Sequence, residues 1–357
     1  MIEGGALRVI SLFGIPVKIH WTFGLLFLYV GYIGVRHGMP WQSTLLYGLF
    51  VICLFICVVL HELGHALMAR RFNVKTVDII LSPIGGVARL THLPSNPKQE
   101  FLIAIAGPLV NVAIAIVVGI IIFGFGVDLS QFLVEREEVT ILPGDFLPLL
   151  LVMNVVLFFF NLIPAFPMDG GRVLRALLSM RWSRVSSTLI AVRIGQILAV
   201  LFVLGGLWME QFVLPFIGVF IFLSAANELK HVRMDDYLSF KTVEEIYRDQ
   251  FTVLYEFDPI SYAWDRSKRT LEQYFLVSDV SGHISGYLSV QSIQKALQAQ
   301  DMDNFIQAYK STHIESIDAE MPLKHLYQLF YSQGFRILPV YKDGTLVGVV
   351  DQRSFMG

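Results

Sequence analysis

The sequence predicts a polytopic α-helical membrane protein of about six transmembrane helices, with a small membrane-associated β region and a C-terminal α/β unit. Hydrophobic residues make up 55% of the 357 residues, charged residues only 16%, and mean hydropathy is +0.61. Soluble domains are typically about a quarter charged. The long apolar runs lie almost entirely before residue 230, and residues 240–357 are more polar. We therefore expect two domains, 1–230 in the membrane and 240–357 outside it.

The apolar part divides into six candidate spans. A spanning helix needs about 20 mostly apolar residues, and such stretches occur at 21–35, 45–66, 101–125, 146–163, 188–207 and 211–228. The first is short and rich in glycine. The last two form one apolar block, which Gly205-Gly206 and Glu210-Gln211 divide.

Charge predicts the orientation of these spans, because Lys and Arg favour cytoplasmic loops. Basic residues precede the first span and follow the second, fourth and sixth, whereas the opposite loops hold only Arg36 and Arg136, beside an acidic run at 135–138. An even number of spans places both termini and the C-terminal unit in the cytoplasm. The N-terminus lacks the layout of a cleaved signal. The net charge of −2 gives no indication of nucleic-acid binding.

The stretch CVVLHELGHALMAR (57–70) places three ionisable residues at the end of an apolar run. His61 and His65 are four apart and share one helix face. Both imidazoles can bind one zinc ion, with Glu62 beside them as general base. Because ionisable groups are costly inside a membrane, the HExxH motif indicates function here more strongly than it would in a soluble helix.

A catalytic zinc site takes a third protein ligand. The stretch NLIPAFPMDGGRVLRA (161–176) follows the fourth span and contains Asp169. Pro164 and Pro167 end a helix there, and Gly170-Gly171 permits a sharp turn. Asp169 either reaches the zinc from this second helix or caps the helix that follows.

Residues 74–93 are rich in strand-forming residues on both sides of SPIGG, which predicts a β-hairpin; a plain interfacial loop is the alternative. Three asparagines, Asn111, Asn154 and Asn161, lie within or at the ends of spans. Bonding between helices and a role at the site are both open for Asn111 and Asn154. For Asn161 we favour the site.

Three motifs occur in order along the chain: HELGH at 61–65, GPLVN at 107–111 and NLIPAFPMDGGR at 161–172. With GIPVKIHWTF near the N-terminus and SPIGG at 82–86, they resemble the site-2 protease family of intramembrane zinc metalloproteases over about residues 10–230, in particular its sporulation-factor subgroup. The resemblance implies one Zn²⁺ held by His61, His65 and Asp169, Glu62 as catalytic acid/base, and Asn161 near the bound substrate.

The resemblance also implies the substrate. Family members cut membrane-tethered regulators within or near a transmembrane segment, such as anti-sigma factors, pro-transcription factors or signal-peptide remnants. The expected partners are therefore a single-span membrane protein and the lipid bilayer, and the expected location is the cell (inner) membrane.

The C-terminal unit carries a repeat: FLVSDVSGHISG (275–286) aligns without gaps on ILPVYKDGTLVG (337–348). Each copy predicts two strands joined by a turn. The repeat resembles a tandem pair of CBS modules, which implies ATP or AMP binding and association into a homo-oligomer. Ser292 and Ser354 stand where the family's nucleotide pattern has a ribose-binding aspartate. Asp351 replaces a hydroxyl that Ser289 provides in the first copy. A dimerisation or substrate-docking module without a nucleotide is therefore the alternative.

These features favour an intramembrane zinc endopeptidase regulated by the C-terminal pair. The alternatives are a transporter gated by that pair and a pseudoprotease that binds substrate without cutting it. The apolar part lacks the two similar halves common in transporters, and all four expected catalytic side chains are present, which argues against a pseudoprotease.

Overall fold

The computed structural model describes residues 5–83, 85–91, 94, 96–127 and 143–355. The chain divides into two compact units, Met1–Val232 and Arg233–Gly357. We treat each unit separately. The acidic run at 135–138, including Arg136, which the orientation prediction used, lies outside the described residues.

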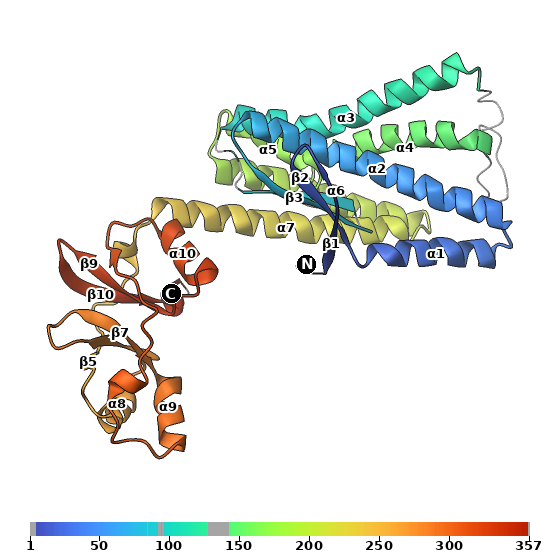
Figure 1. Cartoon of the computed structure of the whole chain (residues 1–357). Coiled ribbons are helices and arrows are strands. Elements are labelled where there is room, and N and C mark those ends of the chain that lie inside the picture. Colours follow the sequence, from blue (N-terminus) through green and yellow to red (C-terminus); the bar gives the residue numbers. More distant parts are fainter. Residues whose placement is uncertain (1–4, 84, 92–93, 95, 128–142, 356–357) are drawn as a thin grey trace. The chain divides into compact units, whose positions relative to one another are not determined.

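Long helices dominate the N-terminal unit and lie side by side (Figure 1). Its helices are α1 (Phe23–Arg36), α2 (Trp41–Arg71), α3 (Pro97–Gly124), α4 (Phe146–Asn161), α5 (Asp169–Ser179), α6 (Arg184–Trp208) and α7 (Val213–Phe240), the last running past the division at Val232. Among the described residues, five helices are long and apolar enough to cross a membrane: α2, α3, α4 with the turn before it, α6 and α7. They correspond to five of the six predicted spans.

The first predicted span, described above as short, is the one that does not reach the length of a membrane-crossing helix. Residues 21–35 form α1, which has only 14 residues and falls below the length of a full span. At about 1.5 Å per residue it is roughly 21 Å long. The apolar composition of residues 21–35 predicts a span. Strand β2, however, extends to His20, and the helix begins only at Phe23.

A four-stranded sheet packs beside α2. Its strands are β1 (Ala6–Leu12), β2 (Ile15–His20), β3 (Thr76–Ser82) and β4 (Gly85–Leu90), in that order across the sheet. β1–β2 and β3–β4 are antiparallel hairpins, whereas β2 and β3 pair in parallel, with Lys18 opposite Ile80. Ile15, Val17, Ile79 and Leu81 pack on Leu63 and Ala66 of α2. The predicted hairpin at 74–93 is therefore confirmed, and the sheet is larger than expected.

Local sequence sets several helix ends. Asn96 caps α3, accepting a hydrogen bond from the Lys98 backbone N–H at 2.9 Å, and Pro97 occupies the first helical position. Ser183 caps α6 in the same way. Helix α4 ends at Asn161, and the residues before Asp169 form a loop without regular structure that contains Pro164 and Pro167.

The C-terminal unit contains two similar halves, each a three-stranded sheet with helices. The first has β5 (Val253–Tyr255), α8 (Ile260–Ser267), β6 (Tyr274–Ser278), β7 (Ile284–Ser289) and α9 (Val290–Gln298). The second has β8 (Ile317–Asp318), α10 (Leu323–Ser332), β9 (Ile337–Lys342) and β10 (Thr345–Asp351). The aligned copies of the repeat are the antiparallel hairpins β6–β7 and β9–β10, as predicted. Each half has its own closed apolar core.

Candidate metal centre

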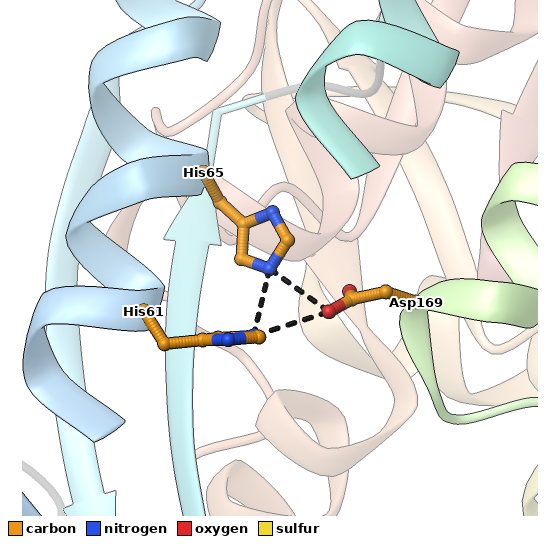
Figure 2. A group of neighbouring side chains, drawn as sticks. All are labelled: His61, His65 and Asp169. Atoms are coloured by element: carbon orange, nitrogen blue, oxygen red, sulfur yellow. Dashed lines mark hydrogen bonds and ion pairs between the residues drawn. The ribbon is translucent and has the colours of Figure 1, made fainter. Parts of the chain in front are cut away.

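Three side chains from two helices converge at one buried point of the N-terminal unit (Figure 2). His61 and His65 lie one turn apart on α2, and their Nε2 atoms are 3.1 Å apart. Asp169 begins α5, and its Oδ2 lies 3.1 Å from each of the two Nε2 atoms. The three residues are 6%, 4% and 7% exposed. Among the described residues, this is the group of histidines and carboxylates with the geometry to hold a metal ion.

Asp169 reaches this point because two glycines follow it. A Cβ on Gly170 would lie 2.3 Å from the carbonyl oxygens of Leu162 and Ile163, and one on Gly171 would lie 2.8 Å from the backbone of Ala165. Only glycine lets α5 pack so closely on the loop before it. The Asp169 side chain makes no capping bond to α5, and the residue before the helix is Met168. The carboxylate is directed to the histidines and does not cap the helix.

Helix α3 forms one wall of the centre. A Cβ on Gly107 would lie 2.2 Å from His65 Nε2, so a glycine is required there. The carbonyl oxygen of Ile103 lies 2.7 Å from His65 Nδ1. Because a carbonyl only accepts hydrogen bonds, Nδ1 carries the proton and donates it. The lone pair of Nε2 is then directed to the centre, as a metal ligand requires.

Glu62 lies beside the centre and contacts the sheet. Its Oε2 accepts a hydrogen bond from the Ala88 backbone N–H of β4 at 2.9 Å, and a Cβ on Gly86 would lie 2.9 Å from Glu62 Cγ. β4 is one of the two edge strands of the sheet. The edge of β4 thus lies next to the carboxylate that the sequence singles out as general base.

The donor set fits zinc. Imidazole nitrogens and one carboxylate are common zinc ligands, and ligands about 2.0–2.1 Å from a tetrahedral zinc lie roughly 3.3 Å from one another. The observed separations of 3.1 Å are close to that value. Three protein ligands leave one position for water or substrate, which is the pattern of a catalytic site rather than a structural one.

The three asparagines differ in their contacts. Asn154 donates to the Leu150 carbonyl at 2.9 Å and to Cys57 Sγ of α2 at 3.6 Å, so it links two helices. Asn161 is half-buried at the end of α4 and donates to the Leu157 carbonyl of its own helix at 2.9 Å. Asn111 is 1% exposed, and neither of its side-chain polar atoms has a partner among the described residues. The structure does not bring Asn161 into the His-His-Asp group.

Sequence reasoning missed several supporting groups. The Ile103 carbonyl and the Ala88 N–H are backbone atoms, which carry no signature in the sequence. Gly107 did carry a signal, because a glycine in a helix interior lowers stability unless something packs against it. Gly107 stands in the GPLVN motif, one helical turn before Asn111.

The fold and this centre define a class: a helical, membrane-type protein with a buried metal-binding group on an HExxH helix. Comparison with known proteins then gives the family. Residues 49–205 match the model of Peptidase family M50, and residues 306–357 match that of the CBS domain. The chain thus carries a Peptidase family M50 (site-2 protease) domain, which covers less than half of its length, and a CBS domain at its C-terminus, and its long apolar helices make it an integral membrane protein.

The chain is similar to several named proteins. The zinc metalloprotease MJ0392 of Methanocaldococcus jannaschii is 39% identical over 230 residues, which are 64% of this chain and 62% of the relative, less than two thirds of its length. A Synechocystis sp. protein, sll0528, whose name describes a candidate zinc metalloprotease, is 27% identical over 98% of this chain and 94% of its own. A solved site-2 protease from M. jannaschii is 36% identical, with a TM-score of 0.45, over 63% of this chain and 95% of that one.

The C-terminal unit has a cavity of about 510 Å³ of its own. Arg248, Asp351, Arg353 and Ser354 are among the residues that line it. Arg248 donates to the Asp351 carboxylate at 2.8 Å. The cavity therefore contains two of the positions, 351 and 354, at which the sequence departs from the nucleotide-binding pattern of CBS modules.

Proposed function

We propose that this protein is a zinc-dependent intramembrane endopeptidase. The observation that carries the proposal is the convergence of His61, His65 and Asp169 at 3.1 Å from one another, with Glu62 on the same helix. These three residues would hold Zn²⁺. A bound zinc lowers the pKa of its water towards neutrality and polarises the scissile carbonyl.

The residues of the chain have separate tasks in this proposal. Glu62 takes the proton of the attacking water and passes it to the leaving amine. Ile103 holds His65 in the tautomer that ligates. An extended substrate segment pairs with the edge of β4, beside Glu62, because a peptide bond in a helix must unwind before it is cut. Asn161, at the end of α4, lies near the bound segment.

The substrate that this arrangement favours is a single-span membrane protein. A centre that lies among apolar helices is reached from the bilayer, and the family resemblance favours tethered regulators such as anti-sigma factors, pro-transcription factors or signal-peptide remnants. Regulated intramembrane proteolysis at the cell (inner) membrane is the process that we infer.

The parallel pairing of β2 with β3 supports an even number of membrane crossings. β2 comes before α1 and β3 follows α2, yet the two strands lie side by side. The chain between them therefore crosses the membrane once with α1 and crosses back with α2. Helix α2, with 31 residues, is roughly 46 Å long. α1 at roughly 21 Å and the six residues of β2 at roughly 20 Å together cover nearly the same depth. Both termini and the CBS region are then cytoplasmic.

The C-terminal unit is the regulatory part of the proposal. Arg248 and Arg353 in its cavity suit the phosphates of ATP or AMP. Ser354 has no carboxylate to bind the ribose, but the nearby Asp351 supplies one. We expect ATP or AMP to bind the full chain in a calorimetric titration, and Arg353→Gln to weaken that binding. If neither ATP nor AMP binds, the proposal of nucleotide regulation through the C-terminal unit is rejected. Association of two copies through the unit is expected in light scattering.

The central experiment compares wild type, Glu62→Gln, Asp169→Asn and the control Glu210→Gln, an exposed carboxylate. Each is purified in detergent, assayed for bound zinc by elemental analysis, and tested on a panel of single-span reporters. We expect near one zinc per chain in wild type. Glu62→Gln retains zinc but loses about 10²–10⁴-fold in cutting, and Asp169→Asn loses zinc.

Two results would reject the protease proposal. The first is wild-type protein that binds no zinc when purified without chelators. The second is reporter cutting by Glu62→Gln at the wild-type rate. Zinc bound by wild type and by Glu62→Gln, with no reporter cut by either, would favour a pseudoprotease.

A further inference from the structure

Arg175 is the largest fully buried side chain of the described residues. It lies on α5, the helix that begins with Asp169. Its Nε and Nη2 donate to Glu100 Oε1 of α3 at 2.8 and 2.5 Å, and its Nη1 donates to Glu228 Oε1 of α7. Its guanidinium carbon lies 5.0 Å from the centre of the Phe166 ring. We call Arg175, Glu100 and Glu228 the α5 ion cluster.

A buried guanidinium needs partners, because desolvating an ion is costly unless its charge and its donors are satisfied. Here Glu100 takes two donors and Glu228 a third. Arg184 lies 3.9 Å from the other oxygen of Glu100 and brings the local charge to two positive and two negative groups. The cluster is thus balanced, but each partner comes from a different helix.

The cluster is connected to both sides of the metal centre. Through Arg175 it holds α5, and with it Asp169. Through Phe166 it contacts the loop that leads into Asp169. Through Glu100 it is fixed to the first turns of α3, where the Ile103 carbonyl orients His65. The beginning of α3 therefore sets the separation between the two histidines and the carboxylate.

Glu228 adds a third helix to this frame. Its side chain is 27% exposed, against 7% for Glu100 and 0% for Arg175, so it is the partner that can leave with least cost. Glu228 lies on α7, the helix that runs past the end of the N-terminal unit at Val232. A displacement of α7 would act on the Glu228–Arg175 contact as well as on Ile221 and Ala225, which pack against the loop before Asp169.

We propose that Arg175 is a positioning residue for the metal centre, and that Glu228 makes the position of Asp169 depend on α7. The inference rests on the proposed function, since it assumes that Asp169 binds the metal. Outer partners that orient ligands typically contribute about 10–100-fold to metal affinity. A purely structural cluster would instead affect only the stability of the fold.

The test measures zinc affinity of the full chain by competition with a chromogenic chelator, in wild type, Glu228→Gln, Arg175→Lys and Arg181→Lys. Arg181 is an exposed arginine just after α5 without a described partner, and it serves as the control. Two further readouts separate positioning from folding. These are the thermal midpoint of the metal-free protein and the visible spectrum of the cobalt(II)-substituted protein, which reports ligand geometry.

We expect Glu228→Gln to lower zinc affinity about tenfold and to alter the cobalt spectrum, with the metal-free midpoint unchanged. Arg175→Lys should lower affinity further, and Arg181→Lys should match wild type. If Arg175→Lys does not fold, Glu228→Gln decides. Wild-type affinity and spectrum in a folded Glu228→Gln would overturn the inference, and so would an affinity loss that only parallels a loss of metal-free stability. Wild-type protein that binds no zinc would instead reject the proposed function itself.

Discussion

The two units of the chain differ in how many polar side chains they bury. Of the thirteen buried polar or charged side chains among the described residues, eleven lie in the N-terminal unit, and only Ser278 and Asp351 lie in the C-terminal one. The N-terminal unit in turn exposes large apolar side chains, with Phe123 and Trp208 both 89% exposed. The C-terminal unit folds around three apolar clusters, one in each half and one with residues of both halves.

The difference reflects the solvent for which each unit is built. In lipid, an outward apolar side chain costs nothing, whereas a buried polar group must be satisfied within the protein or serve a function. In water, burial of apolar surface drives folding. Most buried charged groups of the N-terminal unit, such as Asp78, Glu100 and Arg175, accordingly have specific partners within the protein. In the C-terminal unit the repeat and its apolar cores carry the structure.

The largest effect that would test this contrast is expected at Gly107. Gly107→Ala places a Cβ 2.2 Å from His65 Nε2, so either His65 or α3 must move, and zinc affinity should fall more than tenfold. Gly119→Ala on the same helix is the control, because its Cβ would meet nothing closer than Leu151 at 4.0 Å. Chelator competition measures both. Unchanged zinc affinity in Gly107→Ala would show that α3 does not determine the geometry of the metal centre.

A second effect concerns the sheet. Asp78 of β3 is fully buried and bonds Arg89 Nε at 2.6 Å and Lys18 Nζ at 2.8 Å, joining β4 and β2. Asp78→Asn removes the charge that both cations face, and should destabilise the N-terminal unit by about 3 kcal/mol. Thermal unfolding in detergent measures this. Asp343→Asn, at an exposed turn of the C-terminal unit, should leave the transition unchanged.

Acid should act on the same carboxylate. Hydrogen bonds from Arg89 hold the pKa of Asp78 below its usual value. A lowered folded-state pKa means that the contribution to stability is complete above the unfolded pKa of about 3.9 and is lost as pH falls through the folded pKa. The N-terminal transition of wild type should therefore shift below about pH 4 more than that of Asp78→Asn. Equal shifts in the two proteins would contradict this.

A smaller loss of stability is expected from changes at two equivalent glycines of the C-terminal unit. Gly286 and Gly348 are equivalent in the repeat, and a Cβ would lie 2.4 Å from the Ser311 carbonyl oxygen or 2.3 Å from the Tyr247 ring. Either change to alanine should destabilise this unit by about 1–3 kcal/mol through overpacking. Thr345→Ala, on an exposed position of β10, is the control. Both glycine variants should bind zinc like wild type, and a change in zinc affinity would refute the separation of the units' roles.

The smallest effect is expected at Asn111. A buried amide without a partner contributes no hydrogen bond to stability, so Asn111→Leu should change the thermal stability by less than about 1 kcal/mol or raise it. Asn154→Leu loses the bonds to Leu150 and Cys57 and should be the more costly of the two. The reverse order would contradict the view that the Asn111 amide makes no stabilising hydrogen bond.

Much of this architecture could be predicted from local patterns. The HExxH helix, the hairpin at 74–93, five of the six helices and the C-terminal repeat each depend on residues close together in the chain. Asp169 could be placed on the right helix, although sequence alone did not decide between ligand and cap. The glycines that follow it determine the outcome, because they let α5 approach the loop backbone.

The rest depended on contacts between distant residues. Strand β2 pairs with β3, whose residues come 62 positions later in the chain, so nothing near β2 in the sequence predicts a parallel pair. Arg175 looks like one of several arginines after the fourth span. Its burial depends on Glu100 and Glu228, which are 75 and 53 residues away. Pattern reasoning cannot select such partners without the fold.

The parallel contact between β2 and β3 also imposes an order on synthesis. The hairpin β1–β2 leaves the ribosome first, but its partner strand follows only after both α1 and α2 have been made. Until then, one edge of the hairpin stays open, a surface prone to pairing with other chains. The four-stranded sheet can form completely only after α2, the HExxH helix, has been synthesised. A nascent chain therefore completes the wall beside the HExxH helix in the same event that protects its earliest strands.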